Sequence, residues 1–82
     1  MNQKRKQSMS KETLREYLES MFSKEQKLIS RRDHRLNELV AWGTLANADS
    51  EGNGIEQRVI IGNKTFYERM ATIDWLVGRV KE

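Results

Sequence analysis

The apolar residues in the C-terminal third of the chain recur at steps of four or three, the spacing of a heptad seam on a helix. Seven of the eight positions on this seam carry Ile, Val, Phe or Met, and one carries Asn. The spacing predicts a single helix over about 54–81. The seam consists of Ile55, Val59, Asn63, Phe66, Met70, Ile73, Val77 and Val80.

One pair of residues opposes a continuous helix, because Gly62-Asn63 is typical of a tight turn. The alternative is a short β-hairpin at 58–67, with "RVII" and "KTFY" as its strands. An isolated two-stranded hairpin is only marginally stable in water, so the helix is the preferred interpretation. Asn63 then lies on the seam, where one polar residue can fix the register or the oligomer number.

A second set of apolar residues at helical spacing runs through the first half of the chain and predicts one long helix over about 11–46. Glu25 and Arg32 fall near the centre of its apolar face, where an unpaired charge is costly. The alternative is a break near Ser23, because "SKEQ" has the pattern of a capping box. That break would give a three-helix bundle.

The expected fold class is all-α, an antiparallel helical hairpin joined by the polar loop 47–54. Residues 1–9 are polar and basic and are expected to form a disordered arm, and residues 10–82 a single helical domain. A chain of 82 residues has a thin core, and without cysteine no disulfide can reinforce it.

Two helices cannot bury all the large apolar side chains of this sequence, so we expect a homodimer that forms a four-helix bundle through coiled-coil packing. In such a dimer, Glu25 and Arg32 could pair between the chains. The candidate interface residues lie off the main apolar stripes or interrupt them: Trp42, Leu45, Ile61, Asn63, Trp75 and Leu76.

Basic residues gather in the first half of the chain, although the net charge is only +3. On a long helix, several of them would form one cationic stripe, to which the N-terminal arm could add phosphate contacts. Salt bridges within the protein are the simpler explanation of such a stripe. The candidate nucleic-acid-binding residues are Lys4, Arg5, Lys6, Lys24, Lys27, Arg31, Arg32 and Arg35.

The sequence offers little for catalysis. His34 is the only histidine and there is no cysteine, so we expect neither a metal site nor a cofactor. A thin helical hairpin also lacks a pocket in which carboxylates could act on a small-molecule substrate. The chain has no apolar run long enough to cross a membrane and no visible signal peptide, so we expect a cytoplasmic protein without membrane contacts.

The expected function is therefore that of a small non-enzymatic regulatory protein, homo-oligomeric, that acts through contacts with an unidentified protein partner. The alternative is a nucleic-acid-binding regulator that uses the basic stripe and the N-terminal arm.

Overall fold

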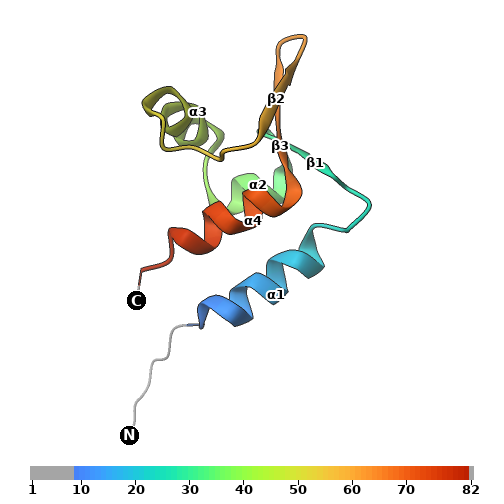
Figure 1. Cartoon of the computed structure of the whole chain (residues 1–82), viewed down its shortest axis with the longest axis vertical. Coiled ribbons are helices and arrows are strands. Elements are labelled where there is room, and N and C mark those ends of the chain that lie inside the picture. Colours follow the sequence, from blue (N-terminus) through green and yellow to red (C-terminus); the bar gives the residue numbers. More distant parts are fainter. Residues whose placement is uncertain (1–8, 82) are drawn as a thin grey trace, which may run out of the picture.

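The computed structural model describes residues 9–81 and contains both helices and a β-sheet (Figure 1). Its three strands form one antiparallel sheet in the order β1-β3-β2. The all-α prediction is therefore wrong, and so are the helical hairpin, the coiled coil and the four-helix bundle derived from it. In chain order the elements are α1 Lys11–Met21, β1 Leu28–Ser30, α2 His34–Leu39, α3 Trp42–Glu51, β2 Arg58–Ile61, β3 Lys64–Glu68 and α4 Arg69–Gly78.

A tight turn at Gly62-Asn63 replaces the predicted helix over 54–81. Ile61 pairs with Lys64, which leaves Gly62 and Asn63 as a two-residue loop. Gly62 has a φ of +63°, and no described residue other than glycine has a positive φ. Glycine at the first central position fits a type II′ turn, which matches the twist of the flanking strands. The alternative prediction, a β-hairpin at 58–67, is thus confirmed, with its second strand extended by one residue to Glu68.

The third strand explains why the hairpin forms. The objection to a hairpin assumed two isolated strands, but β1 pairs along β3, with Ile29 opposite Tyr67. Residues of the apparent helical seam instead face each other across strands, as Val59 and Phe66 do. β-branched and aromatic pairs of this kind stabilise a sheet. Steps of four and three therefore also fit two paired strands followed by a helix, α4.

The predicted helix over 11–46 is also wrong, because three helices and a strand occupy that range. Glu25 and Arg32 would lie on the apolar face of a continuous helix, whereas both are exposed in the connections on either side of β1. Ser23 follows a real break, but it begins no helix. Its hydroxyl binds the Glu25 carboxylate and accepts from the Glu25 backbone N–H. The Ser23 hydrogen bond is the main reason why the pKa of Glu25 lies below its usual value.

Two arginines from distant segments satisfy the carbonyl groups at the C-terminal end of α1. Buried Arg69 donates from Nε to the Phe22 carbonyl at 2.6 Å and from Nη2 to the Glu19 carbonyl at 2.8 Å. Arg35 donates to the Met21 carbonyl at 2.8 Å. Cations are favourable at this end of a helix. Here they satisfy the last carbonyl groups, which in many helices are satisfied by the backbone around a terminal glycine. The helix can therefore end without a Gly or Pro signal in the sequence.

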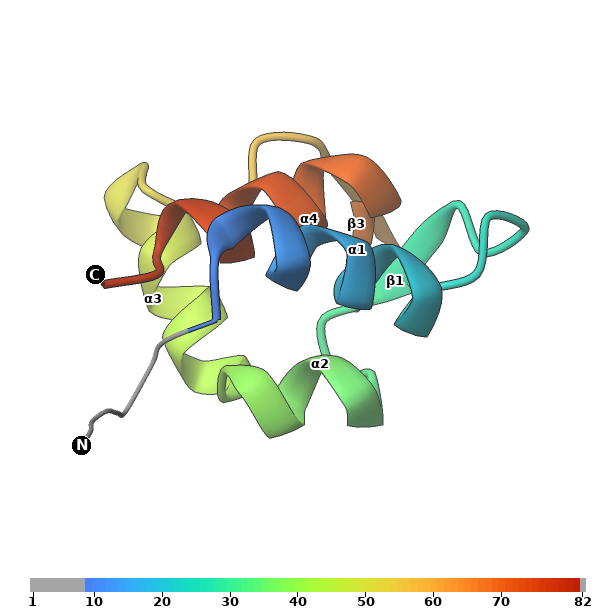
Figure 2. The same ribbon diagram turned by 90° about the horizontal axis from the view of Figure 1, so that it is seen from below.

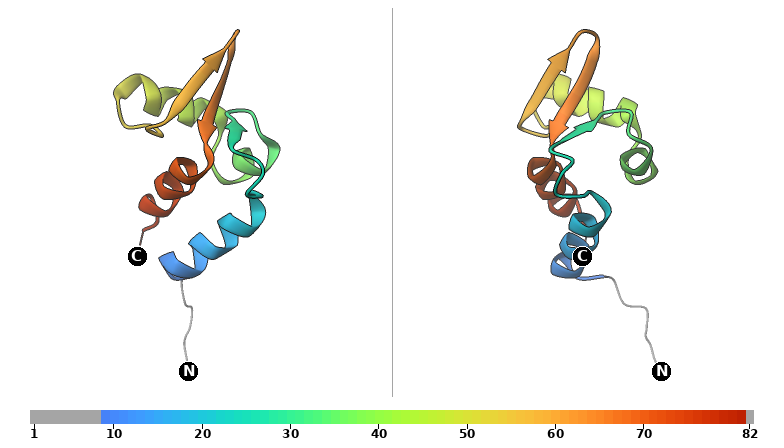
Figure 3. Two further views of the ribbon diagram at one scale, coloured as in Figure 1. Left: turned by 45° about the vertical axis from the view of Figure 1, so that its right-hand side comes forward. Right: turned by 90° about the vertical axis from the view of Figure 1, so that its right-hand side faces the viewer.

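A single apolar core joins all four helices to one face of the sheet. Helices α1 and α4 lie side by side (Figures 1 and 2), and an Arg15–Asp74 ion pair of 2.7 Å links them. The β2–β3 hairpin projects from the opposite end of the molecule, with α3 on one side of it (Figure 3). The core cluster comprises Leu18, Phe22, Ile29, Leu36, Leu45, Ile55, Tyr67, Ile73 and Val77.

Replacing Gly62 tests the turn. A Cβ at Gly62 would meet no atom within 4 Å, so Gly62→Ala carries only the cost of the positive φ. We expect the free energy of unfolding to fall by about 1 kcal/mol. Gly78→Ala is the matched control, because Gly78 ends α4 in equally open space without a positive φ. It should raise stability by about 0.5 kcal/mol. Urea denaturation of both variants measures the difference, and equal effects would contradict the turn.

Candidate nucleic-acid interface

Helices α2 and α3 are consecutive helices joined by a short turn. Asp33 begins α2 by accepting hydrogen bonds from the N–H groups of Arg35 and Leu36. Burial by itself would raise the pKa of Asp33, but these bonds and the Arg35 side chain lower it overall. Val40 and Ala41 are both extended and separate the two helices. A short connection of this kind turns the second helix away from the first.

The N-terminus of α3 offers free backbone donors. Its N-cap residue is Ala41, which has no side-chain acceptor, and the first helical hydrogen bond is donated by Leu45. The N–H groups of Trp42, Gly43 and Thr44 therefore receive no cap from the Ala41 side chain. Uncapped N–H groups and the helix dipole make such an end favourable for an anion.

A basic groove lies between this end of α3, the end of β1 and the tip of the β2–β3 hairpin. Its volume is about 440 Å³. The guanidinium of Arg32 stacks over the Trp42 ring, 3.8 Å from its centroid, and both side chains are exposed. Lys64 and Asn63 face the same groove from the hairpin. The full lining is Ser30, Arg31, Arg32, Trp42, Asn63, Lys64 and Thr65.

The exposed face of α3 is polar. Thr44, Asn47 and Glu51 are exposed and lie within about 60° of one another around the helix axis. The hydroxyl, amide and carboxylate groups of such residues can form hydrogen bonds with the edges of bases. The helix has no Lys or Arg of its own. Any phosphate contacts must therefore come from the flanking groove.

The opposite face of α3 is fixed to the sheet by Asp49. One carboxylate oxygen, Oδ2, accepts from Arg31 Nη2 and from the Tyr67 hydroxyl, both at 2.7 Å. Arg31 Nε also donates to the Tyr67 oxygen at 2.8 Å. The other oxygen, Oδ1, is buried without a hydrogen bond, with Arg58 Nη1 3.7 Å away. A Cβ at Gly54 would overlap this carboxylate, so only glycine fits there.

The network also affects proton binding. Burial is the main reason why the pKa of Tyr67 rises to about 12; Asp49 adds to the rise and Arg31 opposes it. For Arg31, burial would lower the pKa, but the hydrogen bonds with Tyr67 and Asp49 raise it overall. Arg31 is thus held as a cation inside the protein.

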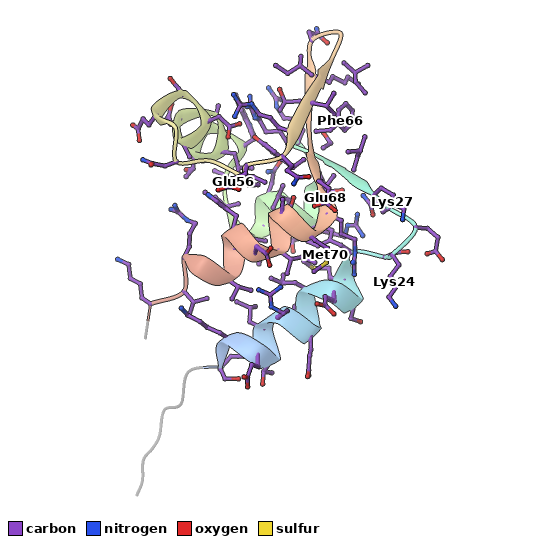
Figure 4. The ribbon with its side chains drawn as sticks, in the orientation of Figure 1. Lys24, Lys27, Glu56, Phe66, Glu68 and Met70 are labelled. Atoms are coloured by element: carbon purple, nitrogen blue, oxygen red, sulfur yellow. The ribbon has the colours of Figure 1, made fainter. Side chains whose placement is uncertain are left out.

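The predicted cationic stripe does not exist as one helix face. Arg31 is bound to Asp49, and Arg35 to Asp33, Gln26 and the end of α1. Lys24 and Lys27 lie in the connection between α1 and β1, on the other side of the sheet from α3 (Figure 4). Of the basic candidates within residues 9–81, Arg32 is the exposed one that lines the groove. Lys4, Arg5 and Lys6 lie outside the described residues.

The candidate interface residues are scattered. Trp42 and Asn63 meet at the groove, whereas Leu45 is fully buried in the core. Ile61 is exposed at the end of β2. Trp75 and Leu76 are half-buried on α4, where Trp75 Nε1 donates to the Asn53 carbonyl at 2.8 Å.

Sequence reasoning missed Lys64, Asp49 and Tyr67. Lys64 directly follows the Gly-Asn pair, so accepting the hairpin would have placed it at the tip. Asp49 and Tyr67 carried no comparable signal in the sequence. Asp49 in particular lies in a segment that resembles a loop.

A larger groove, of about 580 Å³, lies between α4 and the segment before β2. Glu56, Glu68 and Asp74 line it, and Figure 4 shows the first two. This acidic lining would repel phosphate.

No family model, curated protein or solved structure matches this chain significantly. Among the described residues, the helices are too short or too polar to cross a bilayer.

Alkaline titration tests the Asp49 network. The folded chain holds the Tyr67 proton to about pH 12, whereas an unfolded tyrosine loses it near 10. The free energy of unfolding should therefore fall by about 1–2 kcal/mol more as the pH rises through this range than it does in Tyr67→Phe. Tyr17→Phe, at an exposed position, should behave like the parent chain. Urea denaturation at pH 9 to 12 measures this, and parallel curves for the parent and Tyr67→Phe would contradict it.

Proposed function

We propose that this protein binds double-stranded DNA through a helix-turn-helix, with α3 in the major groove and the β2–β3 hairpin beside it. The observation that carries the proposal is the groove in which Arg32, Lys64 and Asn63 surround the uncapped N-terminus of α3. In helix-turn-helix proteins, the N-terminal part of the second helix contacts base edges. Backbone N–H groups at a helix N-terminus commonly bind phosphate.

The division of roles follows from the chemistry of each part. Arg32 and Lys64 supply charge at the two sides of the groove, where phosphates would pass. Thr44, Asn47 and Glu51 are suited to reading bases, because they present both donors and acceptors. The order of elements, a helix-turn-helix followed by a β-hairpin, is that of a winged helix-turn-helix, which supports the proposal at the level of topology only.

Duplex DNA is preferred over duplex RNA for a geometric reason. The major groove of B-DNA admits an α-helix, whereas that of A-form RNA is deep and too narrow for its bases to be read. We propose a regulator without catalytic activity that is located where DNA is present. This proposal keeps the nucleic-acid alternative of the sequence analysis but replaces the cationic stripe with the groove.

Charge reversal in the groove tests the proposal. Arg32→Glu combined with Lys64→Glu should weaken binding to a fluorescent DNA duplex at least tenfold at about 100 mM salt, because two phosphate contacts become repulsive. The slope of log Kd against log salt should also fall by about two. Fluorescence anisotropy at several salt concentrations measures both effects.

The matched control is Lys24→Glu with Lys27→Glu, which changes the net charge equally but away from α3 (Figure 4). Its affinity should stay within about threefold of the parent chain. Equal weakening by both pairs would mean that only net charge matters, and no binding at low salt would refute the proposal. Arg31 and Arg35 are unsuitable for this test, because reversing either would damage the fold.

A further inference from the structure

Strand β2 forms an exposed edge of the sheet, since it pairs only with β3. Val59, Ile60 and Ile61 are exposed by 41, 63 and 57%. Natural proteins usually protect an edge strand with Lys, Pro, a bulge or a covering segment. The centre of β2 has three consecutive β-branched residues instead, and no described element lies along its free side (Figure 3).

The free side of β2 presents unpaired backbone groups at known positions. The Gln57 carbonyl accepts from the Glu68 N–H at 2.9 Å, so it points toward β3. Because direction alternates along a strand, Val59 and Ile61 also bond toward β3. The N–H and C=O groups of Arg58 and Ile60 therefore point outward.

The sheet face that points away from α3 carries exposed apolar side chains, although the register also places Ser30, Lys64 and Glu68 on it. Val59, Ile61 and Phe66 share this face with Leu28, as the strand register requires. Figure 4 shows Phe66 on the side of the hairpin opposite α3. Leu28 is 42% exposed, and no described helix covers this face (Figure 3).

We infer that β2 pairs antiparallel with β2 of a second copy of this chain, centred on Ile60, to form a continuous six-stranded sheet. In this register Ile60 faces its own counterpart, and Val59 faces Ile61 of the second copy. The outward backbone groups at Ile60 form the hydrogen-bonded pair at the two-fold axis. Both apolar faces lie on the same side of the joined sheet, which makes the interface self-complementary.

Charge supports a second copy as the occupant of this edge. Arg58 is the only charged residue of β2, and the register places it opposite Gly62 of the second copy rather than opposite another arginine. Its guanidinium already lies 3.7 Å from Asp49 of its own chain, on the α3 side. No like charges therefore meet across the interface. The inference does not depend on nucleic-acid binding.

Single cysteines test this register, because the chain has no native cysteine. In a hydrogen-bonded antiparallel pair the Cα atoms are about 5.5 Å apart, within the range that a disulfide spans. Ile60→Cys should therefore form a disulfide-linked dimer rapidly under mild oxidation. Ile61→Cys is the matched control, with similar exposure on the same strand. Its counterpart would be more than about 7 Å away, so it should cross-link at least tenfold more slowly.

Light scattering of the unmodified chain, without DNA and at the same concentration, supplies the second measurement. The inference requires a mass of twice 9.7 kDa together with preferential cross-linking at position 60. A monomer mass would overturn it. A dimer mass with equal cross-linking at 60 and 61 would also overturn it, because the dimer would then use another face. DNA binding by a chain that proves monomeric would leave the proposed function intact, and a dimer that binds no DNA would refute that function alone.

Discussion

The carboxylate of Asp49 determines how α3 sits against the sheet. It is nearly buried, and it holds together Arg31 at the end of β1 and Tyr67 in β3. A buried charge is tolerated only when it is paired and hydrogen-bonded, so each of the three groups requires the other two. The groove between α3 and the hairpin exists because this network fixes both of its walls. Arg31 can thus be essential to the candidate interface without touching a ligand.

The basic residues of this domain fall into two groups: those bound to other groups inside the protein, and those whose charge is available at the surface. Arg35 and Arg69 complete α1, and Arg31 completes the Asp49 network, so three arginines are engaged inside the protein. Arg32 differs, because its contact with Trp42 leaves its guanidinium at the surface. The net charge of +3 therefore says little about binding, since the sign of a local groove depends on which cations remain unpaired.

Sequence reasoning could locate the transitions in this chain better than the elements between them. The pattern at Ser23 and the pair Gly62-Asn63 mark real changes of direction. The predicted loop 47–54 is only partly correct, because residues 47–51 belong to α3 and the chain leaves the helix at Gly52. The elements could not be assigned, because apolar residues three and four apart fit a helix as well as short strands and turns. The position of β1 decides the fold, and this strand of three residues is held by pairing with β3, a segment far along the chain, and by burial of Ile29 in the core. For the site, Arg32, Trp42 and Asn63 were named in advance, but the contact between α3 and the hairpin that joins them was not foreseeable.

The end of α1 has a consequence for how the chain is made. Its last carbonyls are satisfied by Arg35 and Arg69, and the Arg69 donor lies 50 residues beyond the Glu19 acceptor. Helix α1 therefore leaves the ribosome without its final partners, which are present only once residue 69 has been synthesised. A helix of eleven residues is marginal on its own, so α1 remains incomplete until then. Translation that stops before residue 69 would release a chain whose first helix has no stable end.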